Sequence, residues 1–294
     1  MHSTLENLLT SGPVVTDGAW GTELQTRGLQ SGDFPDAWNL THPEKVAEVA
    51  RSYVHAGSRI ILTNTFGANR LRMHDQADLS LLVAINRRRV EISREAAAHA
   101  PQGRVYVFAS MGPTGKMLMT AETTEDELRA VFIEQAQAIA AGGADAIVIE
   151  TMGDPAEAVI AVQAAKTTGL PVVGCMVFDS GKNLDRTMMG TTPEQAARQL
   201  SEAGADVIGA NCGQGIAGFV GICQRLRAAT DRPIWIKANA GLPRMEGGRA
   251  VYETTPAEFA AKAREILQAG AQFIGGCCGT NPAFLTELAR TVRG

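Results

Sequence analysis

Three of the five cysteines in this 294-residue chain lie in short motifs whose other residues are glycine or polar. Cys212 follows Asn211, and Cys277 and Cys278 are adjacent within Gly275-Gly276-Cys277-Cys278-Gly279-Thr280. Thiolates are good ligands for Zn²⁺, and a tetrahedral site with three protein ligands leaves one position open, as catalytic zinc sites do. If the fold brings these three sulfurs together, they predict a catalytic zinc site.

Other roles are open to cysteine, because it is also a small and commonly buried hydrophobic residue. We assign that packing role to Cys175, inside the apolar run 171–177, and to Cys223, inside a helical segment. The glycine-rich segment around Cys277 and Cys278 could instead be a backbone cradle for phosphate, of the kind that barrels form after their last two strands. Glycine alone suffices for such a cradle, so the position of the three cysteines favours metal binding.

An alternation of strands and helices would place the three cysteines at one end of a barrel. Eight apolar or β-branched runs recur along the chain, with helical periodicity between them. The runs begin near Pro13, Arg59, Arg104, Asp145, Pro171, Asp206, Pro233 and Gln272. Eight βα units without a linker predict a parallel eight-stranded (β/α)₈ TIM barrel, formed by residues 1–294 as one domain. The alternative is a doubly wound sheet, which typically has a glycine-rich phosphate-binding turn after its first strand. The segment 17–23 lacks the third glycine of that turn.

Helix boundaries carry their own signals. Four helices are expected to begin with a cap residue that is followed three positions later by an acid or an amide. These pairs are Thr124 with Glu127, Asp154 with Glu157, Thr192 with Gln195, and Thr255 with Glu258. Glycines end the helices that lead into every second strand, at Gly57, Gly143, Gly204 and Gly270.

Polar residues follow most of the predicted strands, where barrels collect their functional groups. Asp17 follows the first strand and Glu150 the fourth. The two carboxylates could act as general acid and base, hold an ammonium group, or form structural salt bridges. We expect both to stay charged between about pH 6 and pH 8. A histidine base is not expected, because none of the five histidines, His2, His42, His55, His74 and His99, follows a strand.

The composition and charge of the chain indicate which kinds of molecule it binds. The net charge is −4 and charges of both signs are interspersed, so neither a nucleic-acid footprint nor a membrane-binding patch is expected. The first residues show no signal peptide and no long apolar run follows. We therefore expect a cytoplasmic protein that acts on small molecules, and in that reducing compartment a disulfide framework is not expected.

Taken together, the motifs resemble those of the homocysteine S-methyltransferase family over essentially the whole chain. The similarity is carried by Asp17-Gly18, Thr63-Asn64-Thr65-Phe66, Gly112-Pro113-Thr114-Gly115, Glu150-Thr151, Gly190-Thr191-Thr192, Asn211-Cys212, Asn239-Ala240-Gly241 and the segment 275–280. The resemblance implies a zinc-bearing barrel that methylates the thiol of homocysteine to form methionine. It implies that Cys212, Cys277 and Cys278 are the zinc ligands and carry the catalysis.

The resemblance also bears on the two substrates. It implies that Asp17 and Glu150 hold the amino acid, and we group Gly18, Thr65 and Asn211 with them as substrate-binding residues. The motifs are more similar to the homocysteine module of cobalamin-dependent methionine synthase than to betaine-homocysteine methyltransferase.

The methyl donor stays open at this stage, because the chain has no Asp-x-His-x-x-Gly corrinoid motif and no folate domain. The expected donors are a separate methyl-corrinoid protein or a small onium compound, such as S-methylmethionine or a betaine. Trp20 could face a methylated cation or be a packing residue. Transfer to another thiol, metal-assisted hydrolysis with Glu150 as base, and a non-catalytic thiol or zinc sensor remain alternatives.

Overall fold

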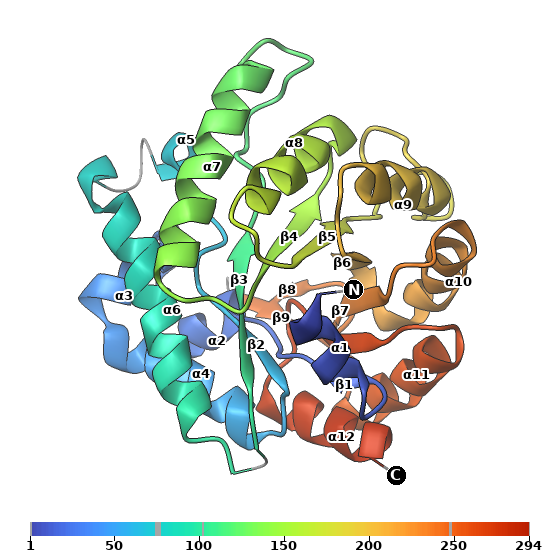
Figure 1. Cartoon of the computed structure of the whole chain (residues 1–294). Coiled ribbons are helices and arrows are strands. Elements are labelled where there is room, and N and C mark those ends of the chain that lie inside the picture. The colour runs from blue at the N-terminus through green and yellow to red at the C-terminus, as the bar shows by residue number, and fades with distance from the viewer. Residues whose placement is uncertain (1, 74–77, 102, 247–248, 294) are drawn as a thin grey trace.

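Eight parallel strands form the centre of the molecule (Figure 1). The computed structural model describes residues 2–73, 78–101, 103–246 and 249–293. The strands are β1 (Val14–Val15), β2 (Ile60–Leu62), β3 (Tyr106–Met111), β4 (Ala146–Met152), β5 (Val172–Met176), β6 (Val207–Gly215), β7 (Ile234–Asn239) and β10 (Phe273–Gly276). Their hydrogen-bonded order is β1-β10-β7-β6-β5-β4-β3-β2. At the remaining seam the amide of Arg59 donates to the carbonyl of Val15 at 2.8 Å, so the (β/α)₈ TIM barrel predicted from the sequence is confirmed.

Helices surround the ring of strands (Figure 1). The longer ones are α4 (Pro43–His55), α6 (Leu82–Ala98), α7 (Glu125–Ala141), α8 (Pro155–Lys166), α9 (Pro193–Glu202), α10 (Phe219–Ala229), α11 (Pro256–Gln268) and α12 (Pro282–Arg293). Shorter helical segments are α1 (Ser3–Leu9), α2 (Gly21–Thr26), η1 (Pro35–Ala37), α3 (Trp38–Thr41), α5 (Arg70–Met73), η2 (Leu79–Leu81) and η3 (Ile216–Gly218). An antiparallel hairpin that the sequence did not predict, β8 (Arg244–Glu246) with β9 (Arg249–Val251), lies between β7 and α11. No helix in the described part of the chain is long and apolar enough to span a membrane.

The helix starts follow the predicted caps with two exceptions. Reciprocal capping boxes form at the starts of α9 and α11. At α7, the hydroxyl of Thr124 accepts from the amide of Glu127, but the Glu127 carboxylate accepts from Thr123 Oγ1 at 2.8 Å instead of reaching back. At α8, Asp154 caps the helix while Glu157 accepts from the amide and hydroxyl of Thr114. Glu157 therefore ties α8 to the loop after β3.

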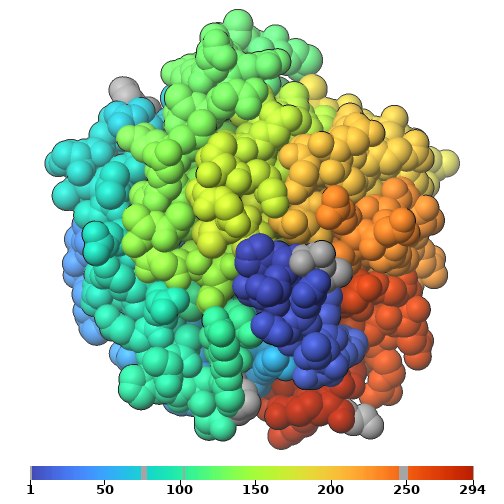
Figure 2. Space-filling model, viewed as in Figure 1, coloured from blue at the N-terminus to red at the C-terminus, as the bar shows by residue number. Residues whose placement is uncertain are grey.

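The barrel interior is apolar at the amino ends of the strands. Alternate residues of each strand point inward, and residues such as Phe108, Val148 and Trp235 form one buried cluster inside the ring. Leu5 and Leu8 of α1 belong to the same cluster and are fully buried. Helix α1 thus closes the amino end of the barrel, and in the space-filling view the N-terminal segment fills the middle of this face (Figure 2).

One step further along the strands, the inward positions become polar. Two residues beyond Phe108, Val148, Gly209 and Trp235 come Ser110, Glu150, Asn211 and Lys237, which share the inward face of their strands. All four are buried. The alternation of inward and outward side chains therefore builds a buried polar layer near the carboxyl ends of the barrel strands. We call the carboxyl ends of the strands and the loops that follow them the rim.

Candidate active site

The three rim cysteines converge. Cys212 lies in β6, and Cys277 and Cys278 directly follow β10. Their Sγ atoms all lie within 4.8 Å of one another, and those of Cys212 and Cys278 are 4.0 Å apart. In a zinc tetrahedron with Zn–S bonds of about 2.3 Å, two sulfurs lie about 3.8 Å apart. This cysteine cluster can therefore bind a metal ion without a large rearrangement.

Sharp backbone turns allow this convergence. Cys212 has a φ of +61° and Gly213 a φ of +70°, where the ladder between β6 and β7 is interrupted. After β10, the amide of Cys277 donates to the carbonyl of Ala238 at 2.7 Å. A left-handed conformation costs a non-glycine residue about 1–2 kcal/mol, and such strain collects at functional sites.

Hydrogen bonds within the cluster give the three thiols different pKa values. Hydrogen bonds from Cys277 and Cys278 lower the pKa of Cys212 to about 3. The same contacts with Cys212 raise the pKa of Cys277 to about 11 and raise the pKa of Cys278 as well. Neighbouring thiolates repel one another, so three ionised cysteines at this distance require a cation between them.

The remaining two cysteines have the packing role expected from the sequence. Cys175 is fully buried in the apolar interior of the barrel, and Cys223 is fully buried in α10. Burial raises the pKa of the Cys223 thiol to about 12 and also raises that of Cys175. Neither thiol is part of the cluster.

A cavity of about 550 Å³ opens beside the cysteine cluster, and we call it the acceptor cavity. It is large enough for a small organic ligand. Its polar and aromatic wall includes all three cluster cysteines together with Gly18, Trp20, Asp36, Phe66, Arg72, Ser110, Glu150 and Lys237. Of the five residues grouped as substrate-binding, Gly18 and Glu150 line this cavity, whereas Asp17, Thr65 and Asn211 do not.

Asn211 and Thr65 are buried behind the cavity wall, where they hold neighbouring strands. The side-chain oxygen of Asn211 accepts from the amide of Thr151 at 2.7 Å, and its Nδ2 donates to Thr151 Oγ1 at 2.7 Å. Thr65 Oγ1 donates to the carbonyl of Ser110 at 2.7 Å. Asn211 thus fixes the left-handed turn at Thr151 that follows Glu150, and both residues position groups of the wall.

Asp17 forms a buried ion pair with Lys237, a residue that no sequence motif singled out. Lys237 Nζ lies 2.5 Å from Asp17 Oδ1, and the two side chains are 2% and 0% exposed. The other oxygen of Asp17 accepts from Trp20 Nε1 at 2.8 Å and from the amide of Leu62 at 2.7 Å. The salt-bridge interpretation left open for Asp17 therefore describes its state in this structure. The available signal was a single charge inside the apolar strand 234–239.

Glu150 faces the cavity and accepts a hydrogen bond from Ser110 Oγ. Burial raises the pKa of its carboxyl to about 7, although the positive charge of Lys237 acts in the opposite direction. The expectation that Glu150 stays charged between pH 6 and pH 8 is therefore wrong, because the sequence does not show how deeply a rim carboxylate is buried.

Trp20 has an internal cation over its ring. The guanidinium carbon of the fully buried Arg89 lies 3.9 Å from the centroid of the Trp20 ring. Trp20 Nε1 is also committed to Asp17. These contacts fit the packing interpretation of Trp20 and leave it less suited to bind a methylated cation, because a second cation would be repelled by Arg89.

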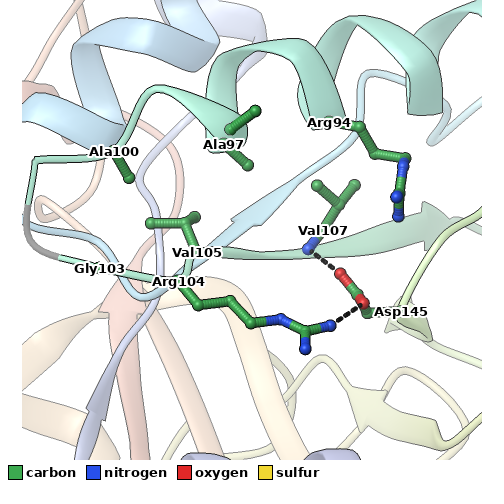
Figure 3. Close-up of a pocket in the computed structure, with 9 residues that line it drawn as sticks. Arg94, Ala97, Ala100, Gly103, Arg104, Val105, Val107 and Asp145 are labelled. Carbon is green, nitrogen blue, oxygen red and sulfur yellow. Dashed lines mark hydrogen bonds and ion pairs between the residues drawn. The ribbon is translucent and has the colours of Figure 1, made fainter.

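A second cavity, of about 360 Å³, lies at the amino end of β3 (Figure 3). Asp145 at its edge is already paired, accepting from the amide of Val107 at 2.8 Å and from Arg104 at 3.1 Å. No cysteine or histidine lines it. The described histidines also lie away from the acceptor cavity, and His74 lies outside the described residues. The chemistry of this protein is therefore expected at the rim.

Substitution of Gly279 tests whether the backbone next to Cys278 must keep its conformation for stability and metal binding. A Cβ added there would lie 2.3 Å from the ring of Tyr252, whereas one added to Gly190 would meet nothing within 4 Å, and both residues have a φ of +81°. We expect Gly190→Ala to lower the free energy of unfolding by about 1–2 kcal/mol for its conformation alone. Gly279→Ala should cost about 1–3 kcal/mol more and reduce metal binding, because Tyr252 or Cys278 must move. Urea denaturation and metal analysis measure both effects, and equal results for the two variants would contradict this account.

The buried carboxyl of Asp36 is expected to make the stability of the protein depend on pH. Burial raises the pKa of its carboxyl to about 7, although its bond with the amide of Gly67 acts to lower it. The folded state thus retains a proton that the unfolded chain loses near pH 4, so stability falls by about 1.4 kcal/mol per pH unit between about pH 4 and pH 7. Asp36→Asn keeps an acceptor for Gly67 and should reduce the slope measured by urea denaturation by about 1.4 kcal/mol per pH unit, while the slope that Glu150 contributes, with its pKa also raised to about 7, should remain. An unchanged slope in the variant would show that Asp36 does not titrate in this range.

Comparisons with known proteins agree with the geometry. The model of the family described as homocysteine S-methyltransferase matches residues 14–292. Methionine synthase of Mycobacterium tuberculosis (strain ATCC 25618 / H37Rv) is 31% identical over 303 residues, which cover 98% of this chain and 25% of that protein. Methionine synthase of Mycobacterium leprae (strain TN) is 31% identical over 291 residues, covering 95% and 24%. The chain thus spans about a quarter of the length of these relatives.

Among solved structures, the metallated form of the homocysteine methyltransferase MmuM from Escherichia coli shares the fold, with a TM-score of 0.81. It is 22% identical, and the match covers 98% of each chain. The family match spans nearly the whole chain and includes the cysteine cluster and Glu150. The chain belongs to the homocysteine S-methyltransferase family.

Proposed function

We propose that this chain, taken as one barrel unit over residues 1–294, transfers a methyl group to the thiol of homocysteine and forms methionine. The observation that carries the proposal is the convergence of three cysteine sulfurs on the wall of a cavity that also contains Glu150. Membership of the family supports the same reaction. The similar proteins named above, two methionine synthases and a homocysteine methyltransferase, support it as well.

We propose zinc as the metal held by Cys212, Cys277 and Cys278. Thiolate ligands select zinc among the common divalent ions, and the spacing of the three sulfurs fits its tetrahedral geometry. When bound, zinc would supply the positive charge that keeps the acceptor thiol, with an ordinary pKa near 8.5, in its nucleophilic thiolate form.

The protein's own groups would orient the acceptor in the cavity. Gly18 lines the cavity and packs closely against the protein behind it, since a Cβ there would lie 2.8 Å from Tyr53 Oη. Glu150 is held by Ser110 and by Asn211, whose Nδ2 is 3.5 Å from Glu150 Oε2. In the reaction, the acceptor sulfur forms a bond to the methyl carbon as the bond between that carbon and its carrier breaks. The carrier leaves with the electron pair of the broken bond.

For the methyl donor, we propose a methyl-corrinoid protein before a small onium compound. Large apolar side chains are exposed on three loops at the rim, with Met119 71%, Met188 60% and Leu242 63% exposed. None of the three lines the acceptor cavity, but they follow β3, β5 and β7 at the same end of the barrel, where exposed apolar groups favour contact with another protein. The alternative, S-methylmethionine or a betaine-like onium, loses support from the cation that already covers Trp20.

A single assay separates these functions. Zinc-loaded protein is incubated with homocysteine and, in separate reactions, a methyl-corrinoid protein, S-methylmethionine or betaine, and methionine is measured by mass spectrometry. We expect methionine with at least one donor and none without homocysteine. Absence of thioether with every donor would contradict the proposal. Turnover that needs no thiol would support metal-assisted hydrolysis instead, for which Glu150, with a pKa of about 7, is a suitable base.

A further inference from the structure

The wall of the acceptor cavity carries a cation that the proposed methyl transfer does not use. Arg72 of α5 lines this cavity and is half-buried. Within the part of the chain that the structure describes, its guanidinium donates no hydrogen bond and pairs with no carboxylate. Arg70 of the same helix, by contrast, donates two hydrogen bonds to Glu134. A guanidinium has five N–H donors in a planar fork that suits a carboxylate, so Arg72 has donors to offer a ligand.

The side chain of Arg72 is held in place by its packing. Its guanidinium carbon lies 5.3 Å from the centroid of the Phe66 ring, a distance at which a cation is attracted to the ring face. A Cβ added to Gly67 would lie 3.0 Å from Arg72 Cδ and Nε and 3.0 Å from Phe34 Cε2. The amide of Arg72 donates to Asn69 Oδ1 at 3.0 Å. Two aromatic rings of the cavity wall thus adjoin an oriented guanidinium, which lowers the entropy lost when a ligand binds.

Two carboxylates interact with Arg72 through space, but both have other partners. They are those of Asp36 and Glu157. Asp36 Oδ1 accepts from the amide of Gly67 at 3.1 Å. Glu157 Oε1 accepts from the amide of Thr114 at 2.8 Å and from its hydroxyl at 2.7 Å. These bonds hold both carboxylates in place, and the donors of the guanidinium stay available to a ligand.

The cavity has room for a second small molecule beside the acceptor. Homocysteine has eight non-hydrogen atoms, which would occupy at most about 240 Å³ at the ~30 Å³ that a water molecule takes in the liquid. The cavity measures about 550 Å³. Around the ring of strands, β2, which precedes α5, lies four strands from β6 in either direction, so Arg72 and Cys212 stand on opposite walls. An acceptor at the cysteine cluster therefore leaves space next to Arg72.

We infer that Arg72 binds the carboxylate of a second small molecule, which occupies the acceptor cavity together with the thiol. The neighbouring rings of Phe34 and Phe66 suit a ligand with a short, compact apolar body. The inference rests on the proposed function, which places the acceptor thiol at the cysteine cluster. Among small methyl donors, it predicts that only those with a carboxylate bind beside the acceptor.

The test compares three unreactive probes that share one apolar body and differ in their polar group. They are 3,3-dimethylbutyrate, the uncharged 3,3-dimethylbutan-1-ol and the cationic 3,3-dimethylbutan-1-amine, titrated by ligand-observed NMR into zinc-loaded protein with saturating homocysteine. We expect the alcohol to bind about 10–100-fold more weakly than the carboxylate, the range for loss of a charged hydrogen bond, and the amine no more tightly than the alcohol. Equal binding of carboxylate and alcohol, or tightest binding of the amine, would overturn the inference.

Variants assign the carboxylate preference to Arg72. Arg72→Met removes the charge but keeps a long side chain against Phe66, so the carboxylate should bind no more tightly than the alcohol while homocysteine affinity stays within about 3-fold of wild type. Arg72→Lys restores the charge without the planar fork and should recover part of the preference, which also guards against misfolding of the methionine variant. Arg70→Met removes a charge of the same helix outside the cavity and should behave as wild type.

The outcomes also distinguish this inference from the proposed function. If homocysteine binds but Arg72→Met keeps the wild-type order of the probes, the Arg72 assignment fails while the proposed function stands. If homocysteine displaces 3,3-dimethylbutyrate from wild-type protein, the two ligands share one place and the inference is overturned. If homocysteine does not bind to zinc-loaded protein, the proposed function fails, and the order of the probes in wild type and Arg72→Met, measured without homocysteine, still decides the Arg72 assignment.

Discussion

Replacing Cys212, Cys277 or Cys278 with alanine is expected to abolish zinc binding and methyl transfer while the barrel stays folded. The three sulfurs lie within 4.8 Å of one another at the rim, and none belongs to the apolar clusters that hold strands and helices together. Loss of a ligand leaves two thiolates, too few to hold zinc in a tetrahedral site. We expect zinc to fall from about one per chain to near zero, and activity to fall by more than the roughly 10–100-fold typical of losing an outer partner.

The other two cysteines provide matched controls for that experiment. Cys175→Ala and Cys223→Ala remove fully buried sulfurs that lie outside the cluster. Both variants should lose some stability, because a buried atom is removed, but should retain zinc. Full zinc content in all three cluster variants, measured by elemental analysis of folded protein, would show that the site is assigned wrongly.

The second large effect is expected from Asp17→Asn. This change leaves the ammonium group of Lys237 buried without its partner 2.5 Å away. Breaking a buried ion pair from one side typically costs about 3–5 kcal/mol, because an uncompensated charge remains in the interior. We expect the free energy of unfolding in urea to fall by about that amount, even though Asn has nearly the same shape as Asp.

A double variant separates loss of the pair from loss of packing. Asp17→Asn combined with Lys237→Met removes both charges and should recover most of the lost stability. As a surface control, Glu265→Gln leaves the exposed Lys262 unpaired and should cost less than about 1 kcal/mol. If Asp17→Asn is as mild as this control, the pair is not an important element of the barrel.

Much of the fold was predictable because its signals are local. The eight strands and the positive-φ glycines at 57, 143, 204 and 270 follow from short apolar runs and from helix ends that need a left-handed residue. The cysteine cluster was predictable for a related reason. Once strands and helices alternate around a barrel, the residues after each strand must meet at one rim.

What the sequence could not give depends on long-range partners. Lys237 and Asp17 are far apart in the chain, and their pairing follows from the closing of the barrel. Glu157 fits the capping pattern, but it accepts from Thr114 of another βα unit. The protonation of Glu150 depends on burial by several strands, which no local pattern reports.

The central claim, that the cysteine cluster holds zinc and that the acceptor thiol joins it there, is tested most directly by X-ray absorption at the zinc edge. The pH dependence of homocysteine binding alone would not suffice, because the pKa of Glu150, about 7, lies in the pH range over which binding would be measured. We predict three sulfur scatterers in zinc-loaded protein, from Cys212, Cys277 and Cys278, and four after saturation with homocysteine. A spectrum that stays at three sulfurs with saturating homocysteine would contradict the account, even if the metal ligands are correct.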